Sequence, residues 1–290
     1  MLAALDRREP KQHGTSGVRG PAAGPRDRML PRCPPPRGKA SSDMTQSDGE
    51  FDQPGLADPP ARVWTELGMT PEVEVHGGFQ SKVFLVQGQA GRLIVKLIES
   101  GRGDAVLRER IEVARQVAEI NPAVVGPIVQ GTEPVITVDR WHAVCYPYVE
   151  GTRPDTTNRA DVETMAETLA ALHDSLATLT EVDLPPVAAL KGTPSGALVE
   201  GQLIHGDYAA ANLIATASGF KVIDFDECGQ GSIEFEIGNS LYMVLFDSWH
   251  AGDRDRYDRF RSWFVGMYRR AASFDVDEAL ADEAIRVRAR

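Results

Sequence analysis

The sequence predicts an α+β fold with two lobes, a small antiparallel sheet first and a mostly helical lobe after it. In the first half, short β-rich runs are separated by glycine-bearing turns, which is the pattern of an antiparallel meander. From Ala160 onward the apolar residues recur at helical spacing instead. Strands that precede helices favour segregated layers over a parallel sheet. We expect a leader over 1–60, an amino-terminal lobe over 61–145 and a carboxy-terminal lobe over 146–290.

The leader is expected to be disordered. Residues 1–43 carry nine Lys and Arg against four Asp and Glu, are rich in Pro and Gly, and contain few large apolar residues. Such a segment buries too little surface to offset the entropy of ordering it. Two interpretations stay open, a basic arm that touches phosphates and a leader without function ahead of a start at Met44. The leader lacks the apolar core of a secretory signal.

Composition excludes several classes of protein. The 290 residues are 42% hydrophobic and 25% charged, which is ordinary globular usage. No apolar run approaches the roughly 18 residues that a membrane-spanning helix needs, so no membrane span is expected. The net charge of −11, which becomes −16 outside residues 1–43, disfavours a nucleic-acid binder. Three widely spaced cysteines, Cys33, Cys145 and Cys228, argue against a disulfide scaffold and for a cytoplasmic location.

The amino-terminal lobe is expected to begin with a short helix and a three-stranded meander. A helix is predicted at 62–67, with Trp64 on its apolar side, and strands are predicted at 72–75, 83–86 and 93–97. Glycine-bearing turns lie between these strands. Further strands are expected at 124–129, 135–138 and 141–149.

A helix is predicted over 105–120, opened by Asp104 as its N-cap. Val106, Val113, Val117 and Ile120 form one apolar stripe, and Glu109 lies on that stripe whereas Glu112 lies off it. A carboxylate among core-facing residues requires a buried partner.

The carboxy-terminal lobe is predicted from three helical patterns. Val162, Met165, Leu169 and Leu172 mark a long amphipathic helix, and further helices are expected at 235–246 and 257–270. Because the chain ends soon after Arg270, we expect the substrate-binding helical part to be small.

The densest group of polar residues lies at 203–227. Here His205-Gly206-Asp207 is followed by Asn212 and, after a turn at 216–219, by Asp224-Phe225-Asp226. Folding the chain about Ser218 makes a hairpin in which 213 faces 223 and 212 faces 224. An amide oxygen beside a carboxylate is a hard-oxygen site suited to Mg²⁺ rather than Zn²⁺. Asp207 is expected to point from its loop toward the same place.

This pattern resembles the aminoglycoside phosphotransferase family, which includes choline kinases and shares the protein-kinase-like fold. The resemblance covers residues 61–270. It implies that Asp207 is the catalytic base and that Asn212 and Asp224 hold magnesium on the phosphates of ATP.

The resemblance also implies a nucleotide site in the amino-terminal lobe. Lys96, on the third strand, is expected to contact the phosphates, and Glu109 is its natural partner, with Glu112 as the rival. The loop at 76–81 would cover the phosphates with backbone N–H groups, and the strand at 143–151 resembles the hinge that carries adenine. The residues assigned to this loop and hinge are Gly77, Gly78, Ser81, Tyr146 and Tyr148.

Other polar residues near the motif are interpreted as structural. His205 is expected to hold the loop, His173 to be a packed helix histidine, and Cys145 and Cys228 to be small buried residues. Glu236 stands where the family usually has the Asp that braces the catalytic loop, and its extra methylene puts that contact in question. Whether Asp226 and Glu227 face substrate or solvent stays open.

The resulting hypothesis is an ATP- and Mg²⁺-dependent enzyme that moves the γ-phosphoryl group to a hydroxyl of a small molecule. Acidic residues crowd the region after the metal site and favour a cationic or neutral acceptor of the aminoglycoside or amino-alcohol type. Two alternatives stay open, a protein serine/threonine kinase of the bacterial stress type and a non-catalytic nucleotide-binding regulator.

Overall fold

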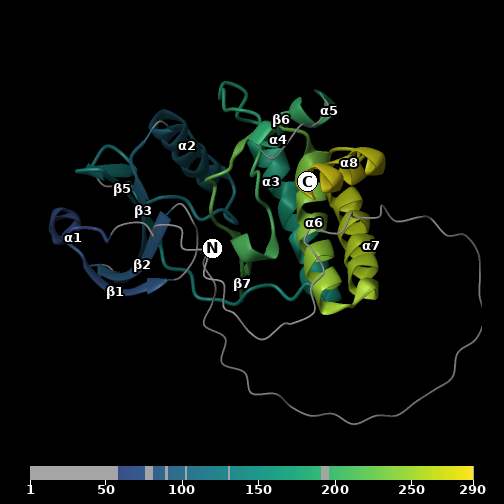
Figure 1. The fold of residues 1–290 in the computed structure, drawn as a ribbon, viewed down its shortest axis with the longest axis horizontal. Coiled ribbons are helices and arrows are strands. Elements are labelled where there is room, and N and C mark those ends of the chain that lie inside the picture. Colours follow the sequence, from purple (N-terminus) through teal and green to yellow (C-terminus); the bar gives the residue numbers. More distant parts are fainter. Residues whose placement is uncertain are drawn as a thin grey trace, which may run out of the picture. The chain divides into compact units, whose positions relative to one another are not determined.

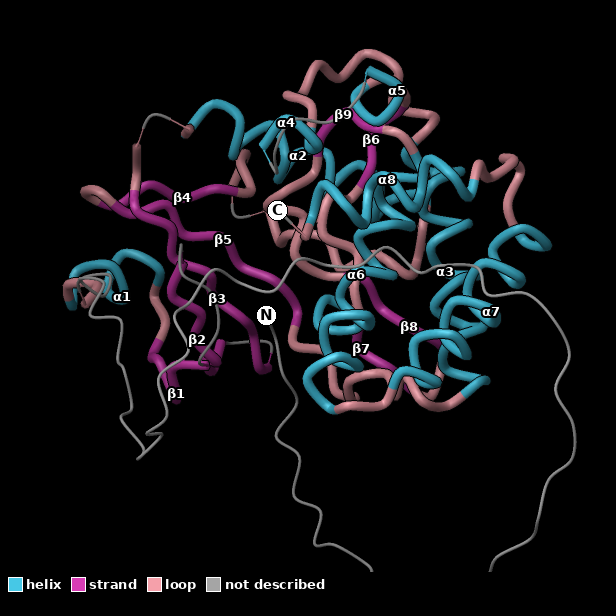
Figure 2. Tube along the Cα trace, turned by 45° about the vertical axis from the view of Figure 1, so that its right-hand side comes forward, coloured by secondary structure: helices cyan, strands magenta, loops and turns pink. Residues whose placement is uncertain are grey.

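The computed structural model describes residues 58–75, 81–88, 91–101, 103–129, 131–190 and 196–289. All of them belong to one compact unit. As predicted, this unit is α+β with two lobes, and Figures 1 and 2 show the sheet and the long helices in separate parts of it. The predicted leader lies outside the described residues, apart from its last three. No described helix is long and apolar enough to cross a membrane.

The amino-terminal lobe contains a five-stranded antiparallel sheet in the order β1-β2-β3-β5-β4. Its first three strands form the predicted meander, because each pairs with the next along the chain. The last of these five strands along the chain, β5, lies between β3 and β4 in the sheet, and Lys96 on β3 stands opposite Val144 on β5. The strands are β1 (Thr70–Val75), β2 (Ser81–Gly88), β3 (Gly91–Glu99), β4 (Val135–Val138) and β5 (Trp141–Pro147).

Helix α1 (Ala61–Leu67) closes the core on one side of this sheet. Its buried residues are Val63 and Leu67, whereas Trp64 is half-buried with its ring edge-on to Phe84 at 4.8 Å between centroids. The predicted helix and the apolar side of Trp64 are therefore confirmed.

Helix α2 (Asp104–Ile120) has the predicted length, but two details of its prediction are wrong. The N-cap is Gly103, and Asp104 instead accepts a hydrogen bond from the Gly101 N–H at 2.6 Å. The buried side of the helix consists of Ile111, Val113, Ala114 and Val117, while Glu109 and Ile120 are exposed. Successive residues of an α-helix point about 100° apart. The predicted apolar stripe is centred one residue away from the buried side, so it places Glu109 on the wrong face.

The predicted strand at 124–129 is also wrong. Only Val124 forms a bridge, to Val222 of the other lobe, and no ladder follows from it within the described segment. The Ile128 N–H donates to the Cys145 carbonyl, while Pro127 has no N–H to offer. The hydrogen bonds of this segment thus go to both lobes, so it forms an irregular connection between them.

The carboxy-terminal lobe is built on α3 (Arg159–Leu176), α6 (Ile233–Ala251), α7 (Arg254–Ala271) and α8 (Glu278–Arg288). The predicted stripe of α3 is confirmed, because Val162, Met165, Leu169 and Leu172 are all buried in the main core. Helix α8 was not predicted, although Asp277 caps it and Ala281, Ala284, Ile285 and Val287 are its buried stripe. The smaller elements are α4 (Val187–Leu190), α5 (Gly196–Val199), β6 (Gln202–Ile204), η1 (Ala210–Asn212), β7 (Leu213–Thr216), β8 (Gly219–Val222) and β9 (Gly229–Gly231).

The hairpin of β7 and β8 forms, but its register differs by one residue from the prediction. Leu213 stands opposite Val222, and Thr216 stands opposite Gly219. A two-residue turn over 217–218 sets this register, because the shortest hairpin loop fits the right-handed twist of the strands. The open end still brings Asn212 near Asp224, since the Ile223 N–H donates to the Asn212 carbonyl at 3.1 Å.

Candidate active site

The loop that carries Asp207 follows β6 and depends on a glycine. Gly206 has a φ of +84°, and a Cβ added there would lie 2.2 Å from the Glu227 carbonyl oxygen. A side chain at this position would meet both a strained backbone and a backbone clash. The sequence His205-Gly206-Asp207 therefore directs the chain past the segment that follows Asp224.

Glu236, near the start of α6, braces this loop. Its carboxylate accepts from the His205 N–H at 2.8 Å and from the Gly206 N–H at 2.6 Å, and it lies 3.2 Å from His173 Nε2. Burial by itself would raise the pKa of Glu236, but the hydrogen bonds from His173 and the loop keep that pKa below its ordinary value. The longer side chain at this position thus makes the bracing contact that its extra methylene had put in question.

Four more hydrogen bonds hold the loop. His205 Nε2 donates to the Ile223 carbonyl at 3.0 Å, and its Nδ1 accepts from the Asp207 N–H at 3.3 Å. The Tyr208 hydroxyl donates to the Met165 carbonyl at 2.7 Å, and Ser240 Oγ donates to the Tyr208 carbonyl at 2.7 Å. The positions of the residues flanking Asp207 are thereby tied to α3, α6 and the end of β8.

Asp207 contacts two side chains from different parts of the chain. Asn212 Nδ2 donates to the Asp207 carbonyl at 2.8 Å and to Asp207 Oδ2 at 3.0 Å. Arg288 Nη2 lies 3.8 Å from Asp207 Oδ1. Sequence reasoning found the first contact through the five-residue spacing and missed the second, because it did not predict α8.

Asp224 and Asp226 face a buried lysine. Lys96 Nζ lies 2.7 Å from Asp224 Oδ1 and 2.5 Å from Asp226 Oδ2, and Lys96 is 8% exposed. Asp224 has a φ of +70°, a conformation that few residues other than glycine adopt and that often marks a functional site. The structure therefore joins Lys96, predicted from the third strand, with Asp224, predicted from the hairpin, and adds Asp226, whose direction the sequence left open.

Burial and ion pairing shift the pKa values of Lys96, Asp224 and Asp226 in opposite directions. Burial alone would lower the pKa of Lys96, but the charges of Asp226 and Asp224 raise it above its ordinary value. Burial also raises the pKa of Asp226, and the neighbouring Asp224 adds to that effect. Asp224 is buried too, but the Lys96 ammonium outweighs the burial and lowers its pKa. One ammonium thus serves two carboxylates, of which Asp224 is the more readily ionised.

Helix α2 reaches this segment through Arg110 rather than Glu109. Arg110 Nη1 donates to the Asp226 carbonyl at 2.5 Å, and its Nε donates to the Cys228 carbonyl at 2.8 Å. The structure does not bring Glu109 to Lys96, because Glu109 is exposed and Lys96 contacts the two aspartates. The rival Glu112 pairs with Arg115. The role assigned to Glu109 stays a prediction.

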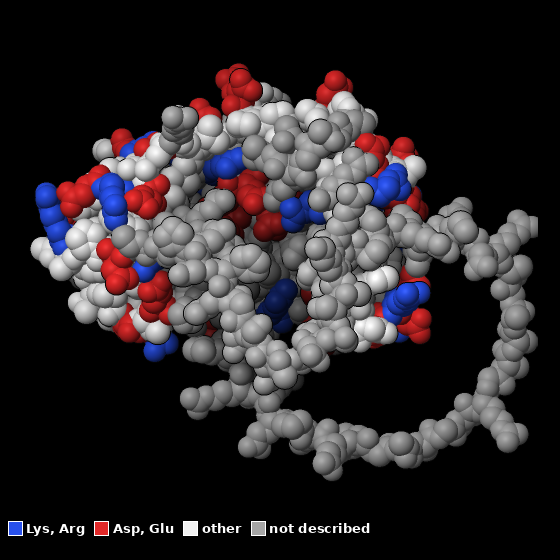
Figure 3. Space-filling model, viewed as in Figure 1, with Lys and Arg blue, Asp and Glu red and all other residues white. Residues whose placement is uncertain are grey.

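The other predicted nucleotide residues lie along the sheet. Ser81 is buried at the start of β2, and Tyr146, on β5, is close enough to Lys96 for their charges to interact. Tyr148 is 40% exposed, with the Arg92 guanidinium 5.9 Å from its ring centroid. Gly77 and Gly78 lie outside the described residues. Figure 3 shows acidic side chains gathered near the centre of this face, with basic side chains beside them.

The donor set fits a hard divalent cation. The residues that could hold one are Asn212, whose amide oxygen is a neutral ligand, and Asp224, whose carboxylate is ionised. Asp226 is a further carboxylate within reach of the same ammonium. Among the described residues, no group of three or more His, Cys, Asp and Glu side chains is arranged to hold a metal ion.

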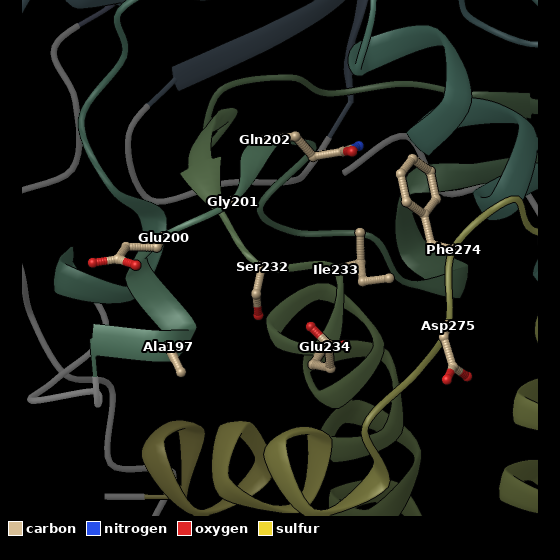
Figure 4. Close-up of a pocket in the computed structure, with 9 residues that line it drawn as sticks. All are labelled: Ala197, Glu200, Gly201, Gln202, Ser232, Ile233, Glu234, Phe274 and Asp275. Carbon is tan, nitrogen blue, oxygen red and sulfur yellow. The ribbon is translucent and has the colours of Figure 1, made fainter.

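A second cavity, of about 390 Å³, lies beside the amino-terminal end of α6. It contains none of the predicted site residues, and Figure 4 shows its carboxylates on Glu200 and Asp275 pointing to different sides. Of its acidic residues only Glu234 is mostly buried, and it accepts a hydrogen bond from the Asp277 N–H at 3.3 Å. These groups do not converge on one ligand.

Comparison with known families places the chain. The model of the phosphotransferase enzyme family, APH, matches residues 72–198 and 188–274. The chain therefore belongs to this family, which confirms the resemblance noted from the motifs. It is a phosphotransferase of the kind that acts on hydroxyl groups of small molecules. No curated protein matches the sequence.

Solved structures share the fold at low sequence identity. An amicoumacin kinase in complex with AMP-PNP, Ca²⁺ and its substrate has a TM-score of 0.63 at 15% identity, over 79% of this chain and 83% of that one. An aminoglycoside phosphotransferase from Alicyclobacillus acidocaldarius has 0.59 at 14% identity, over 83% and 85%. A microcompartment-associated aminopropanol kinase has 0.58 at 18% identity, over 79% and 86%. These similarities support the two-lobed, kinase-like fold.

Proposed function

We propose that the protein uses ATP and Mg²⁺ to phosphorylate a hydroxyl group of a small molecule of the aminoglycoside or amino-alcohol type. The observation that carries the proposal is the convergence of Lys96, Asp224 and Asp226 on one side and Asp207 with Asn212 on the other. Lys96 comes from the sheet, 128 residues before Asp224, whereas the loop and the hairpin follow one another in the sequence. Phosphoryl transfer needs this combination of positioned charges and a base.

Each residue has a proposed task in the reaction. Bound Mg²⁺ supplies charge neutralisation of the phosphates, and Asn212 and Asp224 would hold it. Lys96 leaves its two carboxylates and binds phosphate oxygens. Asp207 orients the acceptor hydroxyl and accepts its proton, while Glu236 keeps the loop in place through the His205 and Gly206 N–H groups. The nucleotide base would lie near Tyr146 and Tyr148.

The printed names of the structural neighbours agree with this chemistry. The nucleotide analogue AMP-PNP accompanies the amicoumacin kinase, and ADP accompanies a spectinomycin phosphotransferase that also holds spectinomycin. The aminopropanol kinase acts on an amino alcohol by its name. A cytoplasmic location and the lobe boundaries at 61–145 and 146–290 stay predictions.

The direct test is a phosphorylation screen with ATP and Mg²⁺ over a library of hydroxyl compounds, read by mass spectrometry. We expect one or a few small acceptors to gain a phosphoryl group, and none to gain it when Mg²⁺ is removed by a chelator. A protein substrate labelled in place of any small molecule would favour the serine/threonine kinase alternative. Nucleotide binding without any transfer would favour the regulator.

A further inference from the structure

Helix α8 brings one arginine to the catalytic carboxylate. Arg288 lies in its last turn, its Nη2 is 3.8 Å from Asp207 Oδ1, and its guanidinium carbon is 5.7 Å from the centroid of the Tyr242 ring. The side chain is 18% exposed. It therefore lies beside Asp207, where an acceptor hydroxyl would have to bind.

The position of Arg288 is determined by rigid contacts. Gly238 of α6 lets α8 approach closely, since a Cβ there would lie 2.5 Å from the Ala284 Cβ and 2.7 Å from the Ala281 carbonyl oxygen. On the other side, Arg261 of α7 binds Asp282 at 2.5 Å and Glu278 at 3.1 Å. Helix α8 is thus held by both of its neighbours, which fixes the backbone from which Arg288 extends.

Arg288 has a buried N–H donor, its Nε–H, that no hydrogen bond uses in the described part of the chain. Its one ion pair, at 3.8 Å, is longer than a charge-assisted hydrogen bond of 2.7–2.9 Å. A guanidinium presents five N–H donors in a fork that matches a carboxylate. The Arg288 Nε–H, which has no partner among the described residues, therefore suits an oxyanion.

The amide of Asn239, on the side of α6 that faces α8, is also unpaired among the described residues. Asn239 is fully buried, and neither its Oδ1 nor its Nδ2 has a partner among the described residues. Phe235, four residues before it, clusters with Ala284 and Val287, and Tyr242, three residues after it, lies under Arg288. Residues at these spacings share one helix face, so Asn239 belongs to the face that meets the end of α8.

Two buried polar groups without partners, one on the face of α6 that meets α8 and one on α8, point to a ligand between these helices. Leaving one buried donor or acceptor unpaired costs about 1–3 kcal/mol, and native proteins contain few such groups. We propose that Arg288 and Asn239 form a subsite that binds a carboxylate carried by the hydroxyl acceptor. This inference rests on the proposed function. It narrows the acceptor to hydroxyl compounds that bear both an amino group and a carboxylate, which remain neutral overall.

The test uses matched pairs of hydroxyl compounds that differ in one carboxylate. The smallest pairs are L-threonine with 1-amino-2-propanol, L-homoserine with 3-amino-1-propanol, and L-serine with ethanolamine, and the library continues with larger pairs built in the same way. For the acceptors that wild type phosphorylates, we expect kcat/KM to be at least about tenfold higher for the carboxylated member.

The variants then locate the carboxylate. Arg288→Gln should lower kcat/KM about 10- to 100-fold for the carboxylated member, mainly through KM, and leave the other member unchanged. Arg288→Lys should cause an intermediate loss, because it keeps the charge and loses the fork. Asn239→Asp should also lower kcat/KM for the carboxylated member, because the new aspartate would supply Arg288 with an anion from the protein itself. The matched control is Arg286→Gln, at an exposed position on the same helix, which should change neither.

The other outcomes overturn the inference in distinct ways. Equal losses for both members of a pair would mean that Arg288 positions Asp207 instead of binding the acceptor. An equal loss of acceptor-free ATP hydrolysis would place the bound oxyanion on the nucleotide. A wild-type preference for acceptors without a carboxylate would contradict the subsite while leaving the proposed function intact. The absence of transfer to every library member would overturn the proposed function itself.

Discussion

Lys96 and Arg288 are basic side chains that reach the carboxylates of the candidate site, one from the sheet and the other from the last helix. Lys96 is paired with two carboxylates at 2.7 and 2.5 Å, whereas Arg288 has, in the described chain, one ion pair at 3.8 Å and a buried Nε without a hydrogen-bond partner. On the nucleotide side, the Lys96 ammonium is already neutralised by Asp224 and Asp226. When nucleotide binds, phosphate oxygens would replace these carboxylates at Lys96, and Mg²⁺ would replace Lys96 at the carboxylates. On the acceptor side, donors are left over for a ligand. Under the proposed function, the two sides would recognise their ligands by different means.

The largest loss of turnover is expected at Asp207, between the nucleotide side and the acceptor side of the candidate site. Asp207→Asn keeps the size of the side chain but removes the base, so turnover should fall about a hundredfold or more. Nucleotide binding should persist, because Asn212 and Asp224 still bind the metal. Steady-state kinetics and nucleotide titration measure the two quantities, with the exposed Asp258→Asn as control. Turnover close to wild type would remove Asp207 from the mechanism.

The next largest effect is expected at Lys96, which pairs with Asp224 and Asp226 on the nucleotide side. Lys96→Met leaves Asp224 and Asp226 without their ammonium, so kcat/KM for ATP should fall about 10- to 100-fold, the scale of a hydrogen bond to a charged group. Thermal unfolding sharpens the comparison, since Mg²⁺ alone should raise the Tm of this variant more than that of wild type by replacing the lost cation. Lys82→Met, at a lysine on β2 that pairs with Asp58, is the matched control. An equal response to Mg²⁺ in both proteins would contradict the shared metal site.

A smaller effect is expected at the brace that supports Asp207. Glu236→Gln should lower the unfolding free energy at neutral pH by about 1.5–3 kcal/mol, because a charged acceptor of two buried N–H groups is lost. The folded-state pKa of Glu236 lies below its ordinary value of 4.5, so the stability that it contributes is present above pH 4.5 and is lost as the pH falls through the folded pKa. Denaturant titrations from pH 7 to 3 should show wild type approaching the variant in acid. A constant difference over that range would mean that Glu236 is not ionised in the fold.

The smallest effect is expected at Glu109. Since its side chain is exposed and Lys96 pairs elsewhere, Glu109→Gln should change kcat/KM for ATP by no more than about twofold, as for an exposed charge. Glu112→Gln, three residues on, serves as the comparison because Glu112 pairs with Arg115. A tenfold loss in Glu109→Gln alone would mean that α2 brings Glu109 to Lys96 when nucleotide binds.

Local patterns predicted most elements correctly. The strand at 135–138 has its predicted bounds, the apolar stripe of α3 is buried as expected, and the meander pairs in chain order. Helix α8 could have been found from the cap at Asp277 and the apolar spacing after it. The strand at 124–129 could not have been excluded in this way, because Val124 and Val125 are buried as strand residues would be, although no ladder follows from Val124.

For the site, the sequence by itself determined which residues share a loop or a hairpin. The short spacings from His205 to Asn212, and the turn before Asp224, encode local geometry that any compact fold retains. Only the tertiary structure decided that Lys96 meets Asp224, which is 128 residues away, and that Arg288 meets Asp207. Such contacts depend on how rigid elements rotate and stack, and a change of one residue along a helix turns a side chain by about 100°. The side of α2 that carries Arg110 and the turn of α8 that carries Arg288 were settled by packing.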